Sequence, residues 1–97
     1  MLQLKQTQHL ISNMIGEYQK EMLTITMEEC AEIIQACSKI IRFGETEKSL
    51  TNLEKEIGDL QCMIDILHQN DYVSFTRIDT YALEKQEKLK VYSNLYK

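Results

Sequence analysis

The amino-acid sequence predicts an all-α fold, a four-helix antiparallel bundle, on three observations. The 97 residues include no proline and only three glycines. No alternating apolar–polar pattern long enough for a β-strand is present, and apolar residues recur at helical spacing in four segments. A chain of this length forms one domain, residues 1–97, with a modest core. We therefore expect homo-oligomerisation, as a homodimer or homotetramer, to complete the bundle.

The first two helices are predicted on either side of a short β-branched stretch. Residues 4–23 carry apolar side chains at helical spacing, whereas the LTIT stretch at 23–26 is expected to be extended. The second helix is expected over residues 26–43. It has a Thr-x-x-Glu capping-box pattern that begins at Thr26, and Gly44 is a suitable C-terminal stop.

The remaining two helices are delimited by polar residues. The third is expected to begin at Thr46 or at Thr51 and to end at Asn70–Asp71, and the fourth to run from Ser74 or Thr76 to Tyr96. The third has the cleanest apolar stripe, which we expect to lie in the core: Leu53, Ile57, Leu60, Met63/Ile64 and Leu67. An isolated glycine, Gly58, interrupts this helix, and close backbone packing or ligand access would account for it. Short connections between such helices predict antiparallel neighbours.

Composition limits the classes of function. A net charge of −4 argues against a protein that binds nucleic acid by broad phosphate neutralisation. Three cysteines, Cys30, Cys37 and Cys62, lie within apolar helical patterns without metal-ligand spacing, so we expect reduced, buried thiols. The N-terminal region lacks a signal-peptide pattern, and no apolar run is long enough to cross a bilayer. These features predict a cytoplasmic protein without a membrane partner.

Acidic residues form the most informative pattern. Glu29 and Glu32 are three residues apart, as are Glu56 and Asp59, so each pair lies on one face of its helix. If these two helices are antiparallel neighbours, four carboxylates could converge, and such a group would be stable only with cations present. An all-carboxylate set favours Mg²⁺, or Mn²⁺, over zinc. The alternative interpretation is that both pairs lie on solvated helix faces.

Basic residues continue the same face of the second helix. Lys39 follows Glu29 and Glu32 at helical spacing, and Arg42 lies one turn further on. These cations could bind the oxygens of a metal-bridged phosphate chain. Alternatively, they are simply well placed near the negative end of the helix dipole. The spacing does not decide between the two interpretations.

The acidic motifs resemble those of the MazG-like family of all-α nucleoside triphosphate pyrophosphohydrolases. The family has EExxE on one helix and ExxD on the next, and here the motifs read EECAE at 28–32 and EIGD at 56–59. The resemblance covers residues 26–92 and is closer to small stand-alone phage or bacterial members than to the histidine-biosynthesis relatives. It implies that Mg²⁺ is bound by Glu29, Glu32, Glu56 and Asp59, with Glu28 in support. On the last helix it implies phosphate contacts from Lys85 and Lys88, although Lys85 stands where the family has an asparagine.

The resemblance implies the reaction NTP + H₂O → NMP + PPi on a nucleoside triphosphate or its deoxy form. We expect a glutamate of the first motif, Glu29 or Glu32, to accept the proton of the attacking water. Lys39, Arg42 and Lys88 are expected to stabilise the departing pyrophosphate. The competing hypothesis is a non-catalytic helical dimer that binds a protein partner through an apolar face and carries its acids on the solvated side.

Overall fold

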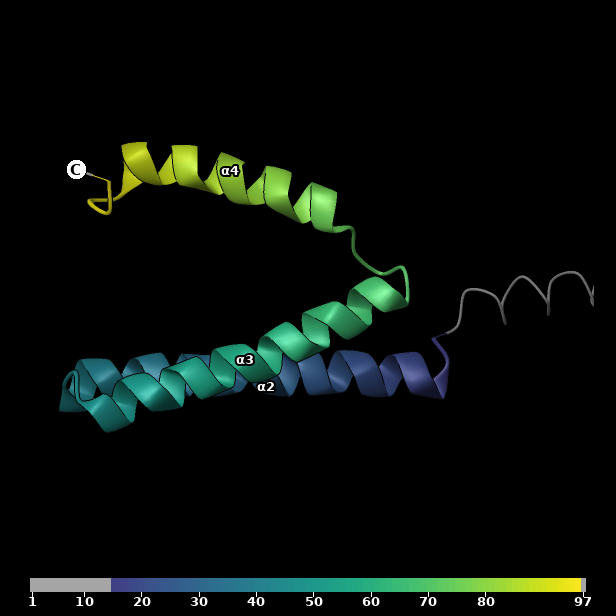
Figure 1. Ribbon diagram of the computed structural model, residues 1–97, viewed down its shortest axis with the longest axis horizontal. Helices are drawn as coiled ribbons and strands as arrows, with labels where there is room; N and C mark the ends of the chain where they lie inside the picture. The colour runs from purple at the N-terminus through teal and green to yellow at the C-terminus, as the bar shows by residue number, and fades with distance from the viewer. Residues whose placement is uncertain (1–14, 97) are drawn as a thin grey trace, which may run out of the picture. The chain divides into compact units, whose positions relative to one another are not determined.

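The computed structural model describes residues 15–96, which form two compact units, one up to Met63 and one from Ile64 onward. All regular secondary structure among the described residues is helical (Figure 1): α2 spans Glu17–Phe43, α3 spans Glu47–Gln69 and α4 spans Phe75–Tyr92. The predicted all-α class is therefore confirmed. Three helices are described, and the part of the predicted first helix before residue 15 lies outside the described residues. No described helix is both long and apolar enough to cross a membrane.

Helix α2 is continuous through the stretch that we expected to be extended. It runs without a break across residues 23–26, so the expected start of a helix at Thr26 is wrong. The hydroxyl of Thr24 donates to the carbonyl of Lys20 at 2.7 Å, and the hydroxyl of Thr26 donates to the carbonyl of Met22 at 2.8 Å. These bonds within the helix satisfy both threonines, and the small intrinsic cost of β-branched residues does not break a long helix.

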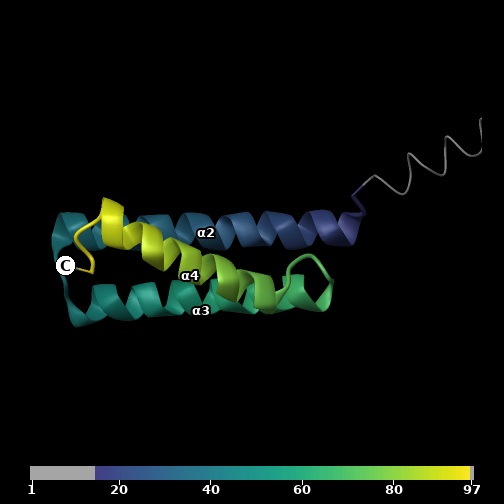
Figure 2. The same ribbon diagram turned by 90° about the horizontal axis from the view of Figure 1, so that it is seen from above.

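A tight connection joins α2 to α3. Gly44 adopts φ 100°, a conformation that favours glycine, and its N–H donates to the carbonyl of Ile40 at 2.9 Å. Thr46 then caps α3 reciprocally with Ser49. The Ser49 N–H donates to Thr46 Oγ1 at 3.0 Å, and the Thr46 N–H donates to Ser49 Oγ at 2.9 Å. Of the two predicted start points Thr46 is therefore correct, and Figures 1 and 2 show α2 and the first part of α3 side by side and antiparallel.

The second unit contains the end of α3 and all of α4. Helix α3 ends where predicted, with Asp71 at φ 60° and the Tyr72 N–H donating to the carbonyl of Leu67 at 2.9 Å. The rings of His68 and Phe75 stack across the turn with centroids 3.9 Å apart. Of the two predicted start points of α4, Ser74 is correct: it caps the helix by accepting from the Arg77 N–H at 3.4 Å. The helix ends at Tyr92, before the predicted Tyr96.

Few apolar side chains are buried in the first unit. Met22 and Ala36 are buried on α2 and Met63 on α3, whereas Ile57, predicted to be in the core, is 47% exposed. All three cysteines are exposed and free, so the prediction of buried thiols is wrong. At Gly58 an added Cβ would meet no atom within 4 Å, which argues against close packing as the reason for this glycine.

Candidate metal centre

The faces of α2 and α3 that carry buried apolar residues also carry acidic residues. On α2, Glu29 lies midway between buried Met22 and Ala36, at seven-residue intervals. On α3, Glu56 lies seven residues before buried Met63 and is itself only 8% exposed. Positions seven apart share a helix face. The helix faces that bury these apolar residues therefore also bring Glu29 and Glu56 between the helices.

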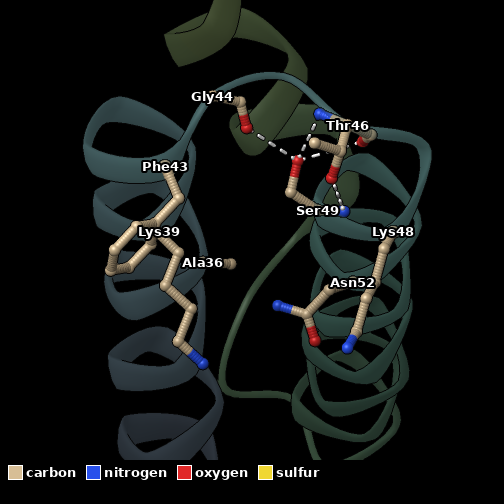
Figure 3. Close-up of a pocket in the computed structure, with 8 residues that line it drawn as sticks. All are labelled: Ala36, Lys39, Phe43, Gly44, Thr46, Lys48, Ser49 and Asn52. Carbon is tan, nitrogen blue, oxygen red and sulfur yellow. Dashed lines mark hydrogen bonds between the residues drawn. The ribbon is translucent and has the colours of Figure 1, made fainter.

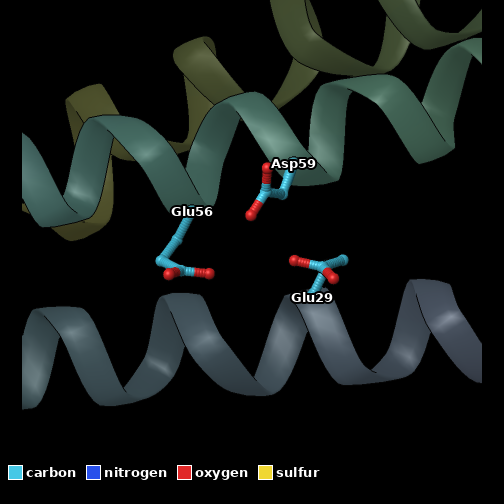
Figure 4. A group of neighbouring side chains, drawn as sticks. All are labelled: Glu29, Glu56 and Asp59. Carbon is cyan, nitrogen blue, oxygen red and sulfur yellow. The ribbon is translucent and has the colours of Figure 1, made fainter.

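Three carboxylates converge between α2 and α3 (Figure 4). Glu29, Glu56 and Asp59 each offer one oxygen atom, and these three oxygens all lie within 4.8 Å of one another. Glu56 is buried, Glu29 is half-buried and Asp59 is exposed, so the group opens toward solvent on one side. Carboxylate oxygens from two helices are a donor set that suits Mg²⁺ or Mn²⁺.

The group carries uncompensated negative charge. Among residues 15–96 the one ion pair joins Lys90 to Glu87 at 2.8 Å, so no basic side chain neutralises the three carboxylates. The pKa of Glu29 is raised, first by partial removal of its carboxylate from water and then by the negative charges of Asp59, Glu56, Glu32 and Glu28. A divalent ion would relieve this repulsion, and the residues present therefore fit such an ion.

The other predicted acidic residues lie outside this group. Glu32 and Glu28 are both exposed, and neither contributes an oxygen to the three-carboxylate group. Each is nevertheless close enough to Glu29 for its charge to raise the pKa of that residue. Glu32 lies on the exposed side of α2. Of the four acidic residues that were predicted to bind the metal, three converge, and the fourth, Glu32, lies outside the group.

The predicted phosphate-binding residues have different surroundings. Lys39 lines a pocket between α2 and the start of α3. The Arg42 guanidinium lies over the Phe43 ring, 5.2 Å from its centroid, and its Nε is 3.4 Å from the carbonyl of Ser38. This placement in the last turn of α2 fits the interpretation that Arg42 interacts with the helix end. Lys85 and Lys88 are exposed on α4, in the second unit.

Sequence reasoning missed two residues of α3 that line the same pocket as Lys39. Lys48 and Asn52 precede Glu56 by eight and four residues, so the three lie along neighbouring turns on one side of α3. That spacing was a usable signal. A helix that began at Thr51, the other predicted start, would have left Lys48 outside α3.

No protein-family model, no curated protein and no solved structure matches the chain.

Proposed function

We propose that this protein is an Mg²⁺-dependent nucleotide pyrophosphohydrolase of the MazG-like type, which converts an NTP or dNTP to the monophosphate and pyrophosphate. The observation that supports the proposal is the convergence of Glu29, Glu56 and Asp59 from two helices with no basic partner. Such a group is costly to fold without a cation and is suited to a metal–phosphate ligand. The EECAE and EIGD motifs contribute these three residues.

In this proposal Glu29, Glu56 and Asp59 hold the ion, and Mn²⁺ could replace Mg²⁺. The bound metal would neutralise charge on the triphosphate and polarise its phosphoryl oxygens. Glu32, exposed and one turn from Glu29, is available to accept the proton of the attacking water. This assignment favours Glu32 over Glu29 as the base, because Glu29 lies within the ligand group.

Lys39 is a proposed phosphate contact in the first unit, since it lines the pocket on the side of the acidic group toward the helix connection. A positive charge there would stabilise charge on the departing pyrophosphate. Arg42, Lys85 and Lys88 remain proposed phosphate contacts on the resemblance and the sequence pattern alone. The three exposed, free cysteines are compatible with a reducing cytoplasmic location.

We further propose that the protein is a homo-oligomer. Met27, Ile34 and Ile41 follow one another at seven-residue intervals on α2 and are 70%, 69% and 85% exposed. A repeated apolar stripe of this kind packs against another helix in coiled-coil geometry. The same stripe favours the alternative function, a non-catalytic helical dimer that binds a protein partner.

The test is product analysis with a panel of NTPs and dNTPs, with and without Mg²⁺. The proposal expects monophosphate and pyrophosphate in equal amounts, only with the metal. Glu32→Gln should lower kcat by about 10²-fold or more while metal binding stays within about threefold of wild type. Glu29→Gln should weaken metal binding as well. Release of orthophosphate, or equal turnover by wild type and a Glu56→Gln/Asp59→Asn variant, would exclude this function and leave the interaction module.

A further inference from the structure

A basic pocket lies at the end of the hairpin where α2 connects to α3 (Figure 3). It has a volume of about 360 Å³, within the range of small-molecule sites. Its walls come from the end of α2, the connection and the first turns of α3: Ala36, Lys39, Phe43, Gly44, Thr46, Lys48, Ser49 and Asn52. Although the protein carries a net charge of −4, this lining contains two lysines and no carboxylate.

The connection that forms one wall is held by its own hydrogen bonds. Ser49 Oγ donates toward the carbonyls of Gly44 and Thr46, at 3.1 and 3.0 Å, and accepts from the Thr46 N–H. These bonds, drawn in Figure 3, engage the serine hydroxyl within the chain. The lining side chains with nitrogen donors are Lys39, Lys48 and Asn52, and the hydroxyl of Thr46, which accepts from the Ser49 N–H, can still donate its own hydrogen. The pocket thus combines a hydrogen-bonded wall with three side chains that carry nitrogen donors.

The three donors approach from opposite helices. Figure 3 shows the amide of Asn52 pointing from α3 into the space between the two helices, Lys39 running along α2 on the opposite side, and Lys48 beside Asn52. Neither lysine forms an ion pair with a described residue, because the one ion pair among residues 15–96 is Lys90–Glu87. The pocket also adjoins the N-terminus of α3, whose dipole adds partial positive charge.

We infer that this pocket binds an oxyanion, namely the phosphate group of a small molecule, through Lys39, Lys48 and Asn52. Two ammonium groups and an amide provide charge-assisted and neutral donors to several oxygens of one phosphate or pyrophosphate group. The ring of Phe43 lies under the Arg42 guanidinium on one face but is 74% exposed, which leaves apolar surface for an organic phosphate. Anion binding here requires neither a metal ion nor hydrolysis and is therefore separate from the proposed function. Lys39 is the residue that the two proposals share.

The test is isothermal titration of the full chain, in EDTA, with three probes: inorganic phosphate, pyrophosphate and AMP. Wild type should bind at least one of them saturably. Lys39→Gln and Lys48→Gln should each weaken binding about tenfold or more. Asn52→Leu, which keeps the net charge, should weaken it about threefold or more. The matched control is Lys55→Gln, an exposed lysine of α3 outside the pocket, which should bind as wild type does. Circular dichroism should report equal helicity for all variants.

The outcomes separate this inference from the metal site. Glu56→Gln/Asp59→Asn should still bind the anion, whereas Lys48→Gln should still bind Mg²⁺. Tighter binding of AMP than of inorganic phosphate would support the site and identify an organic phosphate as its ligand, and equal binding would support a site for the phosphate group alone. The absence of saturable binding by wild type, or equal losses in Lys48→Gln and Lys55→Gln, would overturn the inference whatever the result for hydrolysis.

Discussion

The carboxylates of Glu29 on α2 and Glu56 on α3 lie within 4.8 Å of one another, although 27 positions separate them in the sequence. Both belong to helix lines that bury apolar residues, so the packing of the hairpin holds them together. Two carboxylates at this separation, with Asp59 as a third, repel one another in the absence of a cation. Stability, metal binding and pH should therefore be coupled in this protein.

Divalent metal should stabilise the folded protein. At a Mg²⁺ concentration about 100 times its dissociation constant, preferential binding to the folded state adds about 2.7 kcal/mol, which should appear as a higher melting temperature. Glu56→Gln/Asp59→Asn should remove this response. Glu54→Gln, at an exposed position of α3 outside the carboxylate group, should retain it. An identical melting temperature with and without Mg²⁺ or Mn²⁺ in wild type would contradict the metal site.

The metal-free protein should lose stability as the pH rises above the usual glutamate pKa of 4.5, because the pKa of Glu29 is raised in the folded state. Between these two pKa values the folded chain holds more protons than the unfolded chain, so the free energy of unfolding falls with pH. Glu29→Gln should therefore melt at a higher temperature than wild type at pH 7, and the difference should vanish below pH 4.5. Thermal melts of both proteins at several pH values measure this difference.

The comparison with Glu28→Gln isolates the effect of the cluster. That variant removes the same charge from a neighbouring exposed residue and should change the pH dependence less. An equal rise in melting temperature for Glu28→Gln and Glu29→Gln at neutral pH would mean that general charge repulsion, and not the convergence of carboxylates at Glu29, lowers the stability of the wild type.

Association should depend on the exposed stripe of α2. If Met27, Ile34 and Ile41 pack against a second copy, Ile34→Glu should shift the mass measured by light scattering from oligomer to monomer, because it places a charge in an apolar contact. Gln35→Glu, at the next exposed position of the same helix, should leave the mass unchanged. A monomeric wild type would exclude the homo-oligomer.

The start of α3 should depend on Thr46 and not on Thr51. Thr46→Ala removes the side-chain acceptor for the Ser49 N–H and should lower the free energy of unfolding by about 1 kcal/mol. Thr51→Ala, within the helix, should have little effect or a slightly stabilising one, because alanine is the better helix former. Chemical denaturation of both variants checks this. A larger loss of unfolding free energy in Thr51→Ala than in Thr46→Ala would show that Thr46 is not the cap of α3.

Local signals in the sequence determined the helical class and most of the helix ends. The helix ends are set by hydrogen bonds between residues at most five positions apart, at Gly44, Thr46, the Asn70–Asp71 turn and Ser74. Such short-range bonds can be predicted from residue spacing alone. The stretch at 23–26 was misjudged because its β-branched residues carry only a weak preference, which a long helix overrides.

Tertiary structure alone decided which face of each helix lies inside. Successive residues of a helix point about 100° apart. Helix α3 is rotated by about one residue from the predicted orientation, so Glu56 is buried and Ile57 is exposed. The sequence could list Glu29, Glu32, Glu56 and Asp59 as an acidic set, but the packing of α2 on α3 determined that Glu32 stands outside it and that Lys48 and Asn52 join Lys39 in a pocket. These relationships depend on the rotation of two helices about their own axes, which side-chain packing fixes and residue spacing leaves free.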